Sequence, residues 1–212
     1  MGKKYATLFI PNFDSNDEDK IRTFYTKRNS TENRRLRETI ESICFPPEAE
    51  RMMLRQLALS EPFVVAIKNG RCLAVYDENS TVKKIMNSAK KLAFATDKPV
   101  LFAANYDDDV FFWGECHPDG VKSCEYHLSH PSFAELYGDG KFAFDRKPTG
   151  GWLCEPIYPQ ISAQQSIEAI EAVFEAFFGL PLSISAQELH LEGDTYQQVS
   201  DANGLVLYQK VV

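Results

Sequence analysis

The sequence predicts an α+β fold, in which amphipathic helices pack on a mainly antiparallel sheet built from hairpins. Two observations predict it. Two β-rich runs meet at Asn69-Gly70, a dipeptide that suits the tight type I′ turn of a hairpin. Residues 81–96 repeat apolar side chains at the spacing of an amphipathic helix. Because tight turns join antiparallel neighbours, we expect one sheet of about six to eight strands.

The N-terminal elements are a strand and two helices. Residues 5–10 are mostly apolar and end at a proline, as expected of a short strand. A charged region follows, and its second half carries helical spacing up to Pro46. Pro47 suits the first position of another helix. The first helix carries Leu36, Ile40 and Ile43 at helical spacing, and the second is expected to bury Met52, Met53 and Leu57.

Residues 1–130 form the expected α+β body, which contains two hairpin units. Pro62 opens the unit around Asn69-Gly70, and Pro99 opens a second unit that turns at acidic residues and again near Gly120. The amphipathic helix separates the two units. No glycine-rich phosphate loop follows a predicted strand, which argues against a nucleotide-binding α/β fold.

The C-terminal part is predicted to be a helix and a hairpin. Residues 131–161 are rich in glycine and proline and are expected to be irregular, and residues 162–212 follow, either as a separate unit or within the same domain. Ser162 and Gln165 fit a capping box, and Gly179 closes the helix. The expected buried stripe is Ile167, Ile170, Val173, Phe174, Phe177 and Phe178. The glutamates expected on the outside are Glu168, Glu171 and Glu175.

The composition is that of an ordinary globular protein, with 44% hydrophobic residues in a chain of 212. Its formal charge of −7 argues against binding of nucleic acid or an anionic membrane by the chain as a whole. No run approaches the roughly 20 apolar residues that a membrane-spanning helix needs, and the N-terminal apolar run is too short for a signal peptide. The five cysteines lack paired spacing and fit free thiols, so we expect a cytoplasmic, acidic protein.

Residues 113–131 gather two cysteines and three histidines, and the metal candidates among them are Cys116, Cys124, His127 and His130. Structural zinc prefers ligand pairs about two to four residues apart, and the segment has no Cys-x-x-Cys pair. Side chains three apart in a strand point to opposite faces, which separates Cys124 from His127. We therefore expect an ordinary hairpin without metal or cofactor. Convergence would require a bulge or a strand that ends near Tyr126.

Cys154 is the candidate catalytic nucleophile. Gly150-Gly151, just before it, permits close backbone approach by a ligand. A nucleophilic cysteine needs a base within hydrogen-bond reach and surroundings that stabilise the thiolate. The sequence does not bring a particular histidine to Cys154, and a buried structural cysteine is the alternative.

The strongest charge asymmetry lies between positions 20 and 37, where seven basic residues stand against one acidic residue. The candidate binding residues in this segment are Arg28, Arg34, Arg35 and Arg37. Their ligand would be an acidic protein, a phosphate or a nucleic acid. The alternative is a solvated helix in which arginines pair with glutamates one turn ahead. Trp113 and Trp152 are further binding candidates, because a large ring near glycine either caps the core or anchors a partner.

Three functions from different classes remain open. The favoured one is a non-catalytic protein-interaction module, of the inhibitor or immunity-like kind, because no cofactor fingerprint or catalytic-base motif occurs. One alternative is a hydrolase or transferase with its site near residues 131–161. The other is an anion or nucleic-acid binder that uses residues 20–37. The expected partner is another protein, and the sequence leaves the oligomeric state open.

Overall fold

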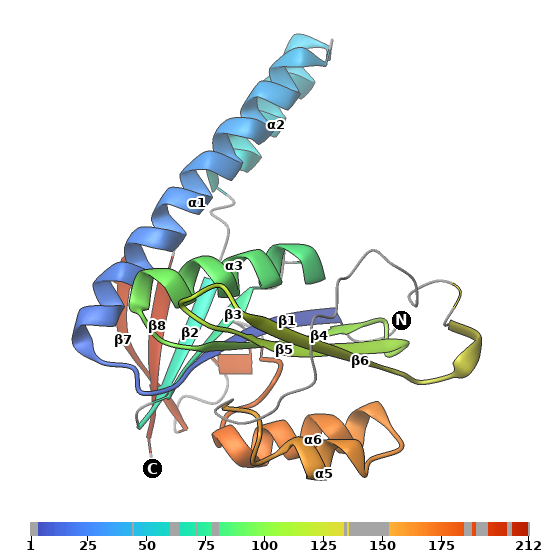
Figure 1. The fold of residues 1–212 in the computed structure, drawn as a ribbon. Helices are drawn as coiled ribbons and strands as arrows, with labels where there is room; N and C mark the ends of the chain where they lie inside the picture. Colours follow the sequence, from blue (N-terminus) through green and yellow to red (C-terminus); the bar gives the residue numbers. More distant parts are fainter. Residues whose placement is uncertain are drawn as a thin grey trace.

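The fold is described from a computed structural model. The described residues are 4–43, 45–59, 64–70, 72–77, 81–133, 135, 153–184, 188–189, 195–202 and 205–211. Within them, one sheet of eight strands carries helices on both faces (Figure 1). This architecture confirms the predicted α+β class with a mostly antiparallel sheet.

The strands follow one another across the sheet in the order β6-β5-β4-β1-β3-β2-β8-β7. Their bounds are β1 Lys4–Ile10, β2 Val64–Asn69, β3 Cys72–Asp77, β4 Val100–Tyr106, β5 Val110–Cys116, β6 Lys122–Leu128, β7 Tyr196–Ala202 and β8 Leu205–Lys210. All neighbours pair antiparallel except β2 and β8, which run parallel, with Val64 opposite Leu205. The C-terminal strands therefore belong to the same sheet as the N-terminal ones.

The first strand lies at the middle of this sheet. β1 pairs with β3 on one side and with β4 on the other. Successive side chains of a strand point to opposite faces, so β1 contributes to two cores. Leu8 packs with the core on one face and Phe9 with the core on the other, and both are fully buried. A strand with both faces covered is apolar throughout, which accounts for the uninterrupted run Leu8–Ile10.

Five α-helices are described: α1 Ser15–Ser42, α2 Pro47–Leu59, α3 Val82–Thr96, α5 Tyr158–Ser162 and α6 Ile167–Phe178. A short 3₁₀ turn spans Pro131–Phe133. Helix α3 covers one face of the sheet, and α5 and α6 cover the other (Figure 1). Ile85 and Leu92 of α3 are fully buried, and Phe174 of α6 packs its ring against Trp113 of β5, with 5.6 Å between ring centroids.

Helix α1 is longer than the sequence predicts, because its charged first half is helical too. Asp14 caps it, accepting hydrogen bonds from the backbone N–H groups of Asn16 and Asp17. The buried α1 residues recur every four positions, which is one line along a helix: Asp17, Ile21, Tyr25 and Asn29. Beyond Asn29 none of the described α1 side chains is buried. The helix leaves the sheet there and continues as an arm with α2 beside it (Figure 1).

This geometry overturns the predicted burial of Met52 and Met53, and it exposes Leu36 and Ile43 as well. The exposed fractions are 50% for Leu36, 47% for Ile43, 59% for Met52 and 37% for Met53. The apolar spacing correctly indicated helices, but on the arm, within the described part of the chain, the two helices have only each other to cover them. The side chain of Leu57 is outside the described part of the chain.

Helix α6 begins later than predicted. It is also rotated about its own axis relative to the predicted orientation, so that a different set of side chains is buried. Its N-cap is Ser166, whose hydroxyl accepts the N–H of Ala169, whereas Ser162 ends α5. Phe177 is 46% exposed, and Glu171 is buried instead. The reason is a polar contact with the sheet: the Glu171 carboxylate accepts hydrogen bonds from Tyr5 Oη at 2.5 Å and Asn105 Nδ2 at 2.7 Å. Two partners compensate the carboxylate for its lost hydration.

Gly114 marks a point where two strands and a core ring leave no space for a side chain. A Cβ at this position would lie 2.1 Å from the carbonyl oxygen of Ser123 and 2.6 Å from Cζ of Phe102. We expect Gly114→Ala to lower the free energy of unfolding by about 3 kcal/mol, measured by urea denaturation. Gly70→Ala is the matched control. Its φ of +56° is strained for alanine but its Cβ meets no atom within 4 Å, so about 1 kcal/mol is expected. Equal losses would contradict this account.

Candidate functional site

The main candidate site is a groove between α1 and α3, which we call the basic groove. Its volume is about 600 Å³. The lining residues are Phe24, Lys27, Arg28, Thr31, Glu32 and Arg35 from α1, and Lys84, Asn87, Ser88 and Lys91 from α3. Figure 1 shows α3 beside the part of α1 that adjoins the sheet. The groove therefore spans the turns of α1 that still pack on the body and the first turns of the arm.

Regular helical spacing brings the groove's charges together. Lys27, Thr31 and Arg35 follow each other at intervals of four on α1, and Lys84 and Lys91 are seven apart on α3. Both spacings keep side chains on one face of a helix. Five basic side chains and one acidic side chain thus line the groove, on a chain whose formal charge is −7. The groove concentrates positive charge on an otherwise acidic protein.

Arg28 is the fixed point of the groove wall. Its guanidinium NH1 lies 2.6 Å from Oδ2 of Asp77, the last residue of β3, and its Cζ lies 4.9 Å from the ring centroid of Tyr25. Burial alone would lower the pKa of Arg28, but the close negative charge of Asp77 outweighs it, and the pKa is raised. Asp77 thus neutralises Arg28, which positions α1 and offers little charge to a ligand.

The other basic side chains of the groove differ in whether they already form an ion pair. Lys84 Nζ lies 3.5 Å from Glu32 Oε1, an ion pair that reaches from α3 to α1. Lys27, Arg35 and Lys91 are exposed, and none of them forms an ion pair within the described residues. These three charges are available to an anionic ligand. Exposed charges of this kind attract partners over a Debye length of about 8–10 Å at ordinary salt.

The structure brings together only some of the predicted binding residues. Arg28 and Arg35 line the basic groove, but Arg34 and Arg37 do not. Arg34 lies on the exposed arm, where its Nε is 3.8 Å from Oε1 of Glu38. Trp113 is fully buried in the core, where its Nε1–H donates to His127 Nε2 at 3.2 Å, so it presents no surface to a partner. Trp152 lies outside the described residues.

Lys84 and Lys91 are the groove residues that sequence reasoning missed. The helical pattern of residues 81–96 correctly placed them on the polar face of a helix, where they resembled ordinary solvated lysines. Only the contact between α1 and α3 turns them toward the arginines. The available signal was a seven-residue repeat of basic residues in each helix, at positions 27, 28, 34 and 35 and at 83, 84, 90 and 91.

The four predicted metal candidates lie on different sides of the sheet. Cys116 and Cys124 pack in the core beneath α3, whereas His127 contacts Trp113 on the opposite face. His130 is exposed, and its Nδ1 lies 2.6 Å from Ser132 Oγ. Among the described residues, no group of three His, Cys, Asp or Glu side chains is placed to hold a metal ion. Strand alternation produces this separation.

Cys154 is fully buried beside a buried carboxylate. Glu115 accepts hydrogen bonds from the backbone N–H groups of Leu153 and Cys154, at 3.0 and 3.1 Å, and its Oε1 lies 2.6 Å from Nε2 of His117. Burial raises the pKa of the Cys154 thiol, and the charge of Glu115 raises it further. A thiol nucleophile needs the opposite environment, with a base or a positive charge at the sulfur. Here Glu115 contacts both Cys154 and the histidine.

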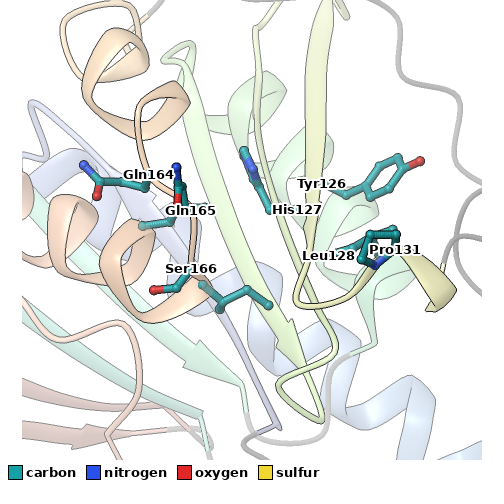
Figure 2. Close-up of a pocket in the computed structure, with 9 residues that line it drawn as sticks. Tyr126, His127, Leu128, Pro131, Gln164, Gln165 and Ser166 are labelled. Atoms are coloured by element: carbon teal, nitrogen blue, oxygen red, sulfur yellow. The ribbon is translucent and has the colours of Figure 1, made fainter.

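A second hollow lies between β6 and the start of α6 (Figure 2). Its volume is about 520 Å³, and its lining residues are Tyr126, His127, Leu128, Pro131, Gln164, Gln165, Ser166, Ile167 and Ile170. Figure 2 shows His127 directed toward Gln165, while Tyr126 points away from it. Burial lowers the pKa of His127, which favours its neutral form. Because no described lysine, arginine or carboxylate lines this hollow, the basic groove is the more specific site.

Searches against protein-family models, curated proteins and solved structures give no match to this chain. Among the described residues, no helix has both the length and the apolar character needed to cross a lipid bilayer.

The environment of Cys154 predicts slow thiol chemistry. In native protein we expect a soluble alkylating reagent to label Cys154 at least about tenfold more slowly than the partly exposed Cys72. Burial raises the pKa of both thiols, and the difference in rate is expected because the Cys154 sulfur is inaccessible. Peptide mass spectrometry after timed labelling measures both rates, and labelling in denaturant gives the reference. Rapid labelling of native Cys154 would contradict this prediction and support an enzyme with a cysteine nucleophile.

Proposed function

We propose that this protein is a non-catalytic interaction module that binds an acidic segment of another protein in the basic groove. The observation that carries the proposal is the convergence of cations from α1 and α3 on a chain of net negative charge. Complementary charge selects partners and speeds their association. The groove is large enough for side chains as well as a backbone, at about 600 Å³.

The dimensions of the groove suit a short peptide segment. Its α1 wall runs from Phe24 to Arg35, and eleven helical steps of about 1.5 Å make it about 16 Å long. An extended peptide advances about 3.3 Å per residue, so about five residues would lie along the wall. Aspartate or glutamate at alternate positions would reach both Lys27 and Arg35 on α1 and Lys91 on α3. Phe24, at one end, offers an apolar contact.

A nucleic acid fits the groove less well than an acidic peptide. Phe24 is the only aromatic side chain that lines the groove among the described residues, so successive bases would lack a stacking platform. Glu32 also lies in the wall and would oppose a phosphate backbone. Beyond the groove, the remaining surface carries net negative charge and would repel a long polyanion.

The surroundings of Cys154 give no support to a catalytic function. The thiol is buried, its pKa is raised, and the nearest acidic group is a carboxylate that already accepts backbone hydrogen bonds. An interaction module does not require a reactive thiol or a catalytic base. The basic groove offers charge, depth and an apolar edge instead.

The proposal is tested with two pairs of lysine variants on the same helix. The groove pair is Lys84→Gln with Lys91→Gln, and the matched control pair is Lys83→Gln with Lys90→Gln, which removes equal charge outside the groove. The probe is a dye-labelled peptide of alternating glutamate and glycine, and fluorescence anisotropy measures its dissociation constant. We expect about tenfold weaker binding for the groove pair and less than about twofold change for the control.

Salt and a competing probe complete the test. Binding of the peptide should weaken as ionic strength rises, because the attraction is between exposed charges. Equal losses in the two pairs would show non-specific charge attraction and refute the groove as the site. A labelled single-stranded oligonucleotide that binds more tightly than the peptide, with the same dependence on Lys84 and Lys91, would identify nucleic acid as the ligand instead.

A further inference from the structure

The outer face of α2 carries a stripe of exposed side chains with opposite charges at its two ends. The stripe consists of Glu48, Arg51, Met52 and Arg55, all of them exposed. Glu48, Met52 and Arg55 recur at intervals of four and three, which places them on one face of the helix. Together with Leu54, these residues line a shallow hollow of about 600 Å³. The apolar side chain of Met52 is 59% exposed.

From this stripe we propose that two copies of the chain associate through α2, antiparallel and related by a twofold axis. An axis that passes between Arg51 and Met52 places Glu48 of each copy opposite Arg55 of the other. Glu48 and Arg55 lie at equal distances along the helix from that point, so both ion pairs form at once. A twofold interface requires this self-complementarity, in which residue i contacts residue j and j contacts i.

The charges at the ends of the stripe are uncompensated within a single copy. Within the described ranges, Glu48 and Arg55 have no ion-pair partner. Arg51 Nε donates to the carbonyl oxygen of Pro47 at 3.1 Å, which draws its guanidinium toward the start of the helix. Met52 is left at the centre of the stripe, where the same residue of the second copy would cover it.

The position of α2 makes this association sterically accessible. Figure 1 shows α1 and α2 projecting from the sheet as an arm, with α2 beside the outer half of α1. A second arm therefore has room to lie along α2 without contact between the two sheets. Four of the ten most exposed large apolar side chains in the described chain lie on this arm: Leu36, Ile43, Met52 and Met53. Of these four side chains, Met52 lies in the stripe.

A second copy fits the stripe better than the acidic partner proposed for the basic groove. One end of the stripe is acidic and the other basic, so a uniformly acidic segment would meet Glu48 as well as Arg55. A copy of the same stripe, turned end to end, matches both. The dimer site and the groove use different residues, so each can be tested without the other.

Charge exchange tests the proposed pairing directly. Sedimentation velocity over a concentration series measures the dimer dissociation constant of the full chain. Glu48→Arg alone and Arg55→Glu alone should each raise it at least about tenfold, because two attractive pairs become repulsive together. The double variant Glu48→Arg with Arg55→Glu should restore it to within about threefold of wild type. A mixture of the two single variants should form a heterodimer, because opposite charges again face each other.

The controls separate this pairing from other outcomes. Glu168→Arg, which makes the same charge change on α6, should leave the dimer unchanged, and circular dichroism verifies that each variant is folded. Wild-type protein that stays monomeric over the whole series overturns the proposal. The proposal is also overturned if the single variants leave the dimer dissociation constant unchanged. It is overturned as well if the double variant and the mixture of single variants both fail to restore dimer formation.

Discussion

The ion pair between Arg28 and Asp77 determines how the long helix meets the sheet. It joins α1 to the end of β3, and a second pair, Lys98 with Asp17 at 2.5 Å, holds the start of the same helix. Both aspartates are almost fully buried, and a buried charge deprived of its partner costs several kcal/mol. Together the two pairs fix the first half of α1 and set the direction in which the arm projects. The basic groove and the arm both follow from that placement.

Much of the fold is encoded locally, and this part could be predicted. The strand pair β2–β3, the helix α3 and the left-handed cap at Gly179 each depend on residues that are close together in the chain. The rotation of α6 could not be predicted in this way, because it depends on Tyr5 and Asn105, which come from distant strands. Apolar spacing on the arm indicated helices without saying whether anything would cover them. Burial is a property of the whole fold, and spacing alone does not determine it.

The candidate site shows the same division between local and distant information. Sequence charge identified residues 20–37 as basic, and Arg28 and Arg35 of this segment do line the groove. Arg28, one of the four predicted arginines, is already neutralised by Asp77. Lys84 and Lys91 became site residues only through the packing of α3 beside α1. Strand alternation, by contrast, was sufficient to separate Cys124 from His127, because it requires knowledge of one strand alone.

The parallel pairing of β2 with β8 has a consequence for biosynthesis. Every other strand pair joins segments that lie nearer in the chain to each other, but β2 must wait for residues 205–210 to leave the ribosome. Until then one edge of β2 along Val64–Ile67, which is buried in the complete fold, is exposed to water with unpaired backbone N–H and C=O groups. Such a nascent chain is open to premature pairing with other nascent chains, and chaperone capture during translation would protect it.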